Sequence, residues 1–314
     1  MGLFSKIRKT QGWMVFELQA DGICVTRVTR TAHARPKVQL AVFYPFAQTE
    51  ASALLSRIHK ELHAKRYECS HLLSPGEYQI LTVETPGVPQ EELKTAVRWL
   101  LKDMLDYHVD DATIDVLDIP VDKNAPARKA MMYVVAARNQ LIAQRQTLFD
   151  SVQIPLKVID IPELAQRNIA SLIAPANRGL ALLSFDQNGS LLTISFNGEL
   201  YLSRRLDINL TQLGSVDGEQ QGNLFEKLTL ELQRTFDHID RQYHFINLAK
   251  LVLTPATPEM SALSTYLTDN LYIPVETLEL SSIFDLPPEL LPIQQQSRFR
   301  TSMGAALRYE DKTP

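Results

Sequence analysis

The fold is decided by one stretch, GLALLSFDQNGSLLTISFNGELYLSRRL (Gly179–Leu206). Two Asn-Gly pairs, Asn188-Gly189 and Asn197-Gly198, divide it into three segments, and this dipeptide is typical of the type I′ turn of a β-hairpin. The segments are rich in Leu, Ile, Phe and Tyr, as strands are. We therefore predict three antiparallel strands, at Gly179–Phe185, Leu191–Phe196 and Glu199–Leu206.

The sequence that follows predicts helices and one short strand. A loop rich in Gly, Ser, Asp and Gln (Gly214–Gly222) precedes a long helix from Leu224 to about Phe245. Leu251–Thr254 is apolar enough for a buried strand, and Met260–Leu271 predicts a helix. Three prolines and three glutamines in Asp285–Gln296 indicate an extended connector. The small residues of Thr301–Arg308 predict a helix that packs closely on a sheet.

The same order of elements occurs near the beginning of the chain. Alternation predicts strands at Trp13–Gln19 and Ile23–Arg30, joined by a turn at Ala20-Asp21-Gly22, and a third strand at Lys37–Phe43. The spacing then becomes helical, with apolar residues at Ala51, Leu54, Leu55, Ile58 and Leu62. A further strand is predicted at Gln79–Glu84. This repeat indicates an internal duplication, as in a pair of ribonuclease-H-like lobes.

Additional elements lie between the two halves. They are a helix from about Gln90 to Tyr107, a strand at Ala112–Ile119, a polar loop at Asp122–Arg128, a strand at Met131–Ala137 and a helix at Asn139–Val152. Ile161-Pro162-Glu163 opens another helix, which we interpret as a bridge. The expected organisation is a first lobe (1–85), an inserted subdomain with a return to the first lobe (86–150), an inter-lobe bridge (151–172) and a second lobe (173–314).

Composition excludes some classes of function. The chain has 314 residues, 45% of them hydrophobic, and a formal net charge of -4, so we expect two lobes with real cores and no nucleic-acid partner. The charge is uneven, because Met1–Arg66 contain eleven Lys and Arg but four Asp and Glu. This basic end is either an ordinary solvated face or a surface that lies against an anionic membrane.

Cysteine content and hydropathy indicate a cytoplasmic protein. The two cysteines, Cys24 and Cys69, make a disulfide framework improbable and favour a reducing compartment. No apolar run approaches the roughly 20 residues of a membrane helix. The basic start MGLFSKIRK lacks the apolar core of an export signal. We expect a protein that reaches a membrane through a partner or a weak surface contact.

Several long stretches resemble the PilM-like family of type IV pilus assembly proteins, and most closely its MshI branch, associated with the MSHA-type pilus. They are LLKDMLDYHVDDATIDVLDIP (Leu100–Pro120), VIDIPELAQRNIA (Val158–Ala170), SLLTISFNGELYLSRRLDI (Ser190–Ile208), LTLELQRTFDHIDRQYHF (Leu228–Phe245) and MGAALR (Met303–Arg308). The resemblance implies an actin-like fold of two lobes with an inserted subdomain. It also implies a cytoplasmic ring component that binds the cytoplasmic tail of a PilN-like bitopic inner-membrane protein.

Actin-like folds bind ATP and Mg²⁺ with three loops, and each departs from the family pattern in this chain. At the first hairpin the pattern Asp-Ile-Gly-Ser-Ser-Ser-Val-Lys becomes Glu17-Leu18-Gln19-Ala20-Asp21-Gly22-Ile23-Cys24, with Glu17, Gln19 and Cys24 at the critical positions. At the second hairpin Asp-Ile-Gly becomes Ser184-Phe185-Asp186, and Asp186 would repel phosphate. At the adenosine loop Gly-Gly becomes Thr254-Pro255-Ala256. We expect no enzymatic activity and no cofactor, although weak binding of ATP stays open.

Other candidate sites have ordinary structural interpretations. His59, His63, Cys69 and His71 could ligate a metal, but a basic, solvent-facing helix followed by a polar strand also explains them, and we expect no metal. Asp237 and Arg241 suit an i,i+4 ion pair on a helix better than an acid–base pair. The GxSxG, Walker and GxGxxG motifs are absent from the sequence, so these hydrolase, NTPase and dinucleotide-binding classes are not indicated.

The resemblance also suggests where a partner binds. In the family the membrane protein's tail lies between the first lobe and the inserted subdomain, which corresponds here to Pro86–Leu105 and Val134–Phe149. Trp99 is either an interface anchor or a core residue, and the other candidate lining residues are Val97, Leu101 and Tyr107. Two alternative functions remain: an active actin-like ATP-binding protein, and a component like the cytoplasmic domain of a type II secretion platform.

Overall fold

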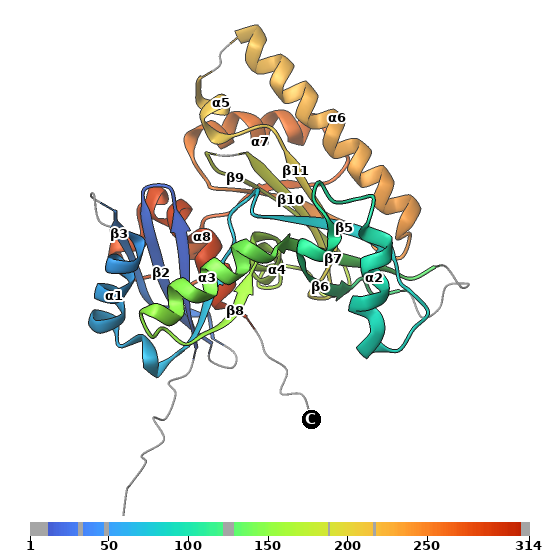
Figure 1. Ribbon diagram of the computed structural model, residues 1–314. Coiled ribbons are helices and arrows are strands. Elements are labelled where there is room, and N and C mark those ends of the chain that lie inside the picture. Colours follow the sequence, from blue (N-terminus) through green and yellow to red (C-terminus); the bar gives the residue numbers. More distant parts are fainter. Residues whose placement is uncertain are drawn as a thin grey trace, which may run out of the picture. The chain divides into compact units, whose positions relative to one another are not determined.

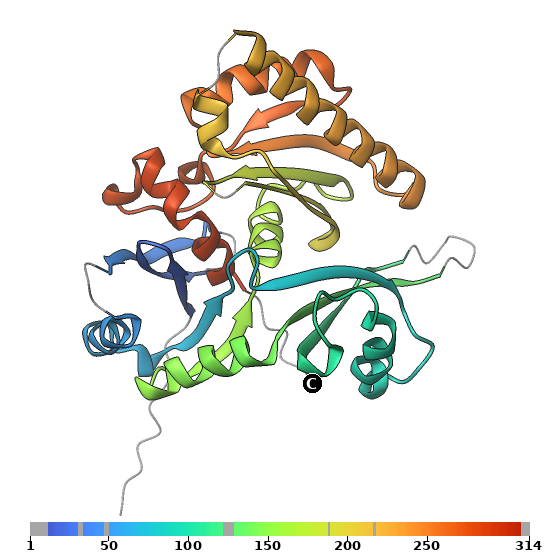
Figure 2. The same cartoon turned by 45° about the horizontal axis from the view of Figure 1, so that its top comes forward.

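The computed structural model describes residues 12–30, 34–46, 50–121, 129–187, 189–215 and 218–308. The basic start and the polar loop at 122–128 therefore lie outside the described residues, as does Asn188 of the predicted hairpin. The chain divides into two compact units, one made of Met1–Val25 and Val42–Pro162 and the other of Thr26–Ala41 and Glu163–Pro314. Figures 1 and 2 show the elements from two directions.

The first five-stranded sheet has the order β3-β2-β1-β4-β8. Its elements are β1 (Trp13–Gln19), β2 (Gly22–Thr29), β3 (Lys37–Pro45), β4 (Glu68–Leu72) and β8 (Leu156–Asp160). Strands β1 and β4 pair in parallel, as do β4 and β8. Helix α1 (Ala51–Leu62) and a 3-10 turn, η1 (Ala64–Arg66), connect β3 to β4, and α3 (Asn139–Ser151) precedes β8. The predicted polar strand is β4, and its Cys69, Ser70 and His71 are fully buried.

The second five-stranded sheet repeats this order as β11-β10-β9-β12-β13. Its elements are β9 (Gly179–Phe185), β10 (Ser190–Phe196), β11 (Glu199–Leu206), β12 (Leu248–Thr254) and β13 (Val275–Thr277). Helices α6 (Gly218–Gln242) and α7 (Pro258–Asn270) cover the same face of this sheet (Figures 1 and 2). When the strands of each sheet are numbered one to five in chain order, both sheets have the spatial order 3-2-1-4-5. The predicted duplication is therefore confirmed.

A third sheet, β5-β7-β6, forms a small separate layer. Its strands β5 (Tyr78–Glu84), β6 (Ala112–Asp118) and β7 (Met131–Arg138) are antiparallel. We assigned Gln79–Glu84 to the first lobe, but β5 pairs with β7 along its whole length. Helix α2 (Leu93–Leu101) packs on β6 and follows the 3-10 turn η2 (Gln90–Glu92). It ends before the predicted Tyr107, and the acidic Asp103 and Asp106 disfavour a longer helix there.

Two predicted loops are partly helical. Within Gly214–Gly222, α5 (Leu210–Ser215) ends and α6 already begins at Gly218; the glycine at 222 costs only about 1 kcal/mol inside a helix. The expected connector at Asp285–Gln296 contains the 3-10 turn η5 (Pro288–Leu290) and the start of α8 (Ile293–Ala306). Its prolines precede α8, where proline is tolerated, and the three glutamines are good helix formers. Both loop predictions were wrong in these parts.

Helix α8 packs closely on both α4 (Pro162–Ala170) and β2. A Cβ atom added to Gly304 would lie 2.4 Å from the carbonyl oxygen of Ala165, so only glycine allows α4 to approach so closely. Asn168 Nδ2 donates to the Gly304 carbonyl at 3.0 Å. The hydroxyls of Thr26 and Ser302 lie 2.8 Å apart in the core. The predicted close packing thus involves a helix as well as a sheet.

Candidate functional site

The first of the three expected nucleotide loops uses its glycine and its cysteine for packing within the fold. Glu17 and Gln19 lie near the end of β1, and Cys24 is a fully buried free thiol on β2. A Cβ atom on Gly22 would lie 2.3 Å from the Tyr44 carbonyl oxygen. This glycine is therefore needed for contact with β3, not for approach to a phosphate. A buried thiol also cannot replace the lysine of the family pattern.

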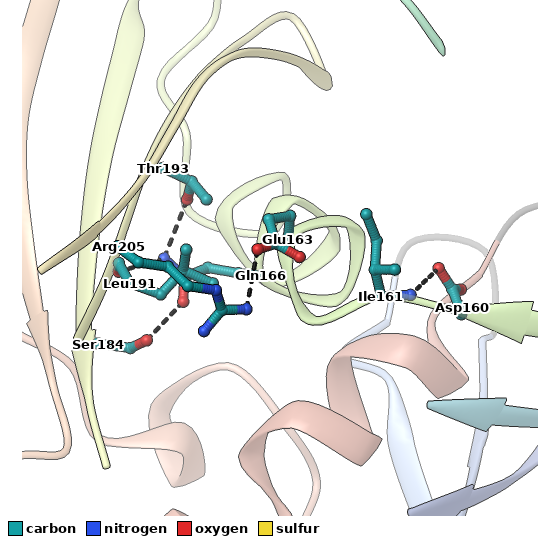
Figure 3. A network of polar contacts seen from close by, with 8 residues as sticks. All are labelled: Asp160, Ile161, Glu163, Gln166, Ser184, Leu191, Thr193 and Arg205. Carbon is teal, nitrogen blue, oxygen red and sulfur yellow. Dashed lines mark hydrogen bonds and ion pairs between the residues drawn. The ribbon is translucent and has the colours of Figure 1, made fainter. Parts of the chain in front are cut away.

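The second loop has a serine where the family pattern has aspartate, and that serine points inward. Ser184 is buried at the end of β9, and its hydroxyl donates to Gln166 Oε1 at 2.6 Å (Figure 3). At the turn, the Asp186 amide donates to the Gly189 carbonyl at 2.9 Å, and the Asp186 carbonyl accepts from the Leu210 amide at 2.9 Å. The hydroxyl and these backbone groups are thus used within the fold.

Gln166 of α4 is the centre of a buried polar network. Its Nε2 lies 2.7 Å from the Leu182 carbonyl, 2.9 Å from the Leu191 carbonyl and 3.0 Å from Thr193 Oγ1. Figure 3 shows Ser184 of β9 and Leu191 and Thr193 of β10 around the side chain of Gln166. Buried amides need such partners because an unpaired polar group in the core is costly. The network therefore explains the polar residues here without a ligand.

Two buried acids near α4 were missed by the sequence analysis. Glu163 is fully buried and forms an ion pair with Arg205 at 2.8 Å. Asp160, 3% exposed at the end of β8, accepts a hydrogen bond from the Ile161 amide at 2.8 Å (Figure 3). Asp160 was missed because β8 was not predicted. The Glu163 charge is balanced within the protein, so this carboxylate does not require a metal ion.

The third loop contains no glycine. Strand β12 ends at Thr254, and a cis peptide bond joins it to Pro255; both residues are buried. The Pro255 carbonyl accepts the Thr257 amide at 3.0 Å, and α7 begins at Pro258. Proline has no N–H to offer a nucleotide and removes the backbone freedom that a Gly-Gly pair supplies.

The histidines and cysteine weighed as metal ligands are divided between two environments. Cys69 and His71 are buried in β4, where His71 Nδ1 lies 3.0 Å from the Phe16 carbonyl oxygen. Burial lowers the pKa of His71 to about 4. His59 and His63 line a hollow at the end of α1. In the described parts of the chain, no three His, Cys, Asp or Glu residues are placed to hold a metal ion.

The predicted pair on α6 is present: Arg241 Nη2 lies 3.8 Å from Asp237 Oδ2. Both side chains are largely exposed, so this contact is worth little free energy. The structural interpretation of these two residues is confirmed.

Helix α2 and the turn that follows it expose apolar side chains. Trp99 is 78% exposed, Leu100 46% and Met104 44%, and we call these three residues the α2 apolar face. Trp99 is therefore not a core residue, and of its two interpretations only that of an interface anchor remains. A large exposed aromatic flanked by apolar neighbours is typical of a binding surface.

Two of the candidate lining residues lie in the core of the inserted subdomain. Val97 and Leu101 are fully buried and pack with Val134 in the core beneath α2, because they occupy the side of the helix that faces the sheet. Their side chains are not accessible in the structure of the chain alone. Tyr107 is partly buried, and the Arg138 guanidinium lies 4.1 Å from the centre of its ring. Burial raises the pKa of Tyr107. Phe149, at the end of the other expected lining segment, is also fully buried.

The repeated sheets with a small inserted layer define a class: the chain has an actin-like fold of two ribonuclease-H-like lobes with an inserted α/β subdomain. It is similar to a solved PilM-PilN type IV pilus biogenesis complex, with 18% sequence identity and a TM-score of 0.71 over 95% of this chain and 98% of that chain. No protein-family model matches the sequence, and no curated protein does.

Two further structures share the fold. One is a Bacteroides thetaiotaomicron protein with an actin-like ATPase fold and unknown function, 10% identical, with a TM-score of 0.51 over 95% of this chain and 99% of that chain. The other is the cytoplasmic domain of EpsL, an inner-membrane component of the type II secretion system of Vibrio cholerae, 13% identical. Its TM-score is 0.51 over 96% of this chain and 97% of that one. Within the described ranges of this chain, no helix is both long and apolar enough to cross a bilayer.

Proposed function

We propose that this chain is a scaffold of the inner-membrane assembly platform of a type IV pilus, of the PilM-like kind and of the MshI branch that serves an MSHA-type pilus. One observation carries the proposal: the likeness to the PilM-PilN structure extends over 95% of this chain and 98% of that one. The sequence stretches that resemble this family lie in the inserted subdomain, in the bridge and in the second lobe. The protein would act in the cytoplasm, as a ring component peripheral to the membrane.

The proposed partner is the cytoplasmic tail of a PilN-like bitopic membrane protein. The α2 apolar face supports this partner because Trp99, Leu100 and Met104 expose apolar surface on the inserted subdomain. A short tail binds a small area, so its affinity depends on a few large anchors. Trp99 is the anchor that we propose.

The three loops support a scaffold without ATPase activity. Cys24 and Ser184 are buried, and Pro255 has no N–H. A nucleotide would need a charged cradle of backbone amides and a carboxylate free to hold Mg²⁺. We propose that the protein neither hydrolyses ATP nor needs it to bind its partner.

A second candidate is a component of a type II secretion platform. The likeness to the EpsL cytoplasmic domain favours it, but the TM-score of 0.51 is lower than the 0.71 of the pilus structure. The identity of the co-purifying membrane protein distinguishes these two candidates.

Co-purification tests the proposed function. The full chain is expressed with the bitopic membrane proteins encoded beside its gene and is isolated from detergent-solubilised membranes. We expect it to remain in the soluble fraction when expressed alone and to co-purify with a PilN-like protein when that protein is present. Recovery with secretion components alone would favour the second candidate, and recovery with neither would refute both.

A further inference from the structure

A basic hollow lies where α1 ends and η1 begins. It is lined by His59, Lys60, His63, Lys65 and Arg66, and its volume is about 300 Å³. A phosphate group and part of an attached molecule would fit. All of the lining belongs to one short segment, so the hollow is complete within one unit of the fold.

The positive charge of this hollow exceeds what helix α1 requires. Cationic side chains often lie at a helix C-terminus because the macrodipole places about half a negative charge there. Lys60 and Lys65 alone supply two positive charges, and neither forms an ion pair with any carboxylate in the described parts of the chain. The hydrogen-bond partner of Lys65 Nζ is the neutral Gln153 Oε1, at 2.6 Å. An excess positive charge remains over the hollow.

His59 adds a polar group that the fold does not satisfy. Its Nδ1 atom is shielded from solvent and has no hydrogen-bond partner among the described residues. Such an atom destabilises the fold unless something pairs with it. Burial lowers the pKa of His59, and the charges of Lys65 and Lys60 lower it further. The same charges disfavour a bound cation, so the pair His59 and His63 does not suit a metal ion.

We propose that the basic hollow binds a phosphate group, carried either by a free phosphate compound or by the headgroup of an anionic lipid. Lysine ammonium groups bind phosphate oxygens as compact point charges, and a neutral histidine ring adds one N–H donor. This binding is separate from the three nucleotide loops and does not depend on the proposed pilus function.

Two probes test this assignment with the full chain at low ionic strength, where screening is weak. Inorganic pyrophosphate is titrated by calorimetry, and co-sedimentation is measured with vesicles of phosphatidylglycerol and, for comparison, of phosphatidylcholine. The variant Lys60→Gln/Lys65→Gln removes two charges from the hollow. The control Lys94→Gln/Lys102→Gln removes two charges from the α2 region, so net charge is matched.

We expect saturable binding of at least one anionic probe, weakened about tenfold or more by the hollow variant, which corresponds to ~1.4 kcal/mol. The control should change it less than about twofold. Binding of pyrophosphate without vesicles identifies a free phosphate compound, and binding of phosphatidylglycerol vesicles without pyrophosphate identifies a lipid headgroup. The proposal is overturned if neither probe binds, or if the hollow variant and the control bind equally. Equal melting temperatures of the two variants verify that both are folded.

Discussion

Replacing Trp99 by alanine should impair partner binding and leave the fold almost unchanged. The side chain is 78% exposed, so about a fifth of it is buried. If the whole side chain has a surface of ~250 Å², the substitution removes ~50 Å² of buried apolar surface. At about 25 cal/mol per Å², the loss of this burial costs about 1 kcal/mol of stability. The better helix propensity of alanine offsets about 0.5 kcal/mol of this loss. We expect the melting temperature to fall by no more than about 2 °C.

The loss of binding should be much larger. An aromatic anchor at the centre of a small interface contributes about 2 kcal/mol or more, so Kd for a synthetic partner tail should rise about 30-fold. Val97→Ala is the matched contrast: Val97 is fully buried on the opposite side of α2, and its truncation should cost about 2–3 kcal/mol of stability. Calorimetry and thermal melting on the same samples separate the two effects. A folded Trp99→Ala variant with undiminished affinity would refute the proposed anchor.

The fold also determines how nucleotide, two substitutions and pH should affect stability. Mg-ATP at concentrations up to millimolar should not raise the melting temperature. Any ligand that binds the native state stabilises it, and we expect Mg-ATP not to bind. A clear rise in the melting temperature would show that the nucleotide loops still bind ATP. Gly304→Val should prevent folding or lower the melting temperature sharply, since its side chain has no room beside Ala165; an unchanged melt would contradict the close packing of α8. Gln166→Leu should cost about 1–3 kcal/mol in urea unfolding, because it removes the amide partner of the buried Ser184 and Thr193 hydroxyls, and an unchanged midpoint would show that the network is dispensable. The pKa of His71 is about 4 when folded and about 6.5 when unfolded, so the stability present above pH 6.5 should fall by about 3 kcal/mol as the pH drops to 4; His71→Leu should flatten this dependence, and an equal slope in both proteins would refute the assignment.

Local sequence signals predicted most of the strands. The Asn-Gly turns and alternating residues place β9 and β11 at their observed bounds, and β1 likewise. Turn chemistry and alternation are properties of neighbouring residues, so they can be read from a single sequence. Strand β13 has only three residues, too few for periodicity to be recognised, and in β8 the apolar Val158 and Ile159 are adjacent rather than alternating, so neither strand was predicted.

The candidate sites depended more on contacts between distant residues. The apolar positions of α2 cover much of its circumference, and only packing on the three-stranded sheet decides that Val97 and Leu101 are buried while Trp99 is exposed. The departures of the nucleotide loops from the family pattern were visible in the sequence. The bond from Ser184 to Gln166 was not, since it joins residues of two different elements.

We propose that this actin-like fold serves as a binding scaffold that works without nucleotide. It is tested most directly by measuring the affinity of the full chain for the cytoplasmic tail of the bitopic membrane protein encoded beside its gene, with and without Mg-ATP. We predict saturable binding with the same Kd under both conditions. An absence of binding, or binding that appears only with Mg-ATP, would contradict the claim.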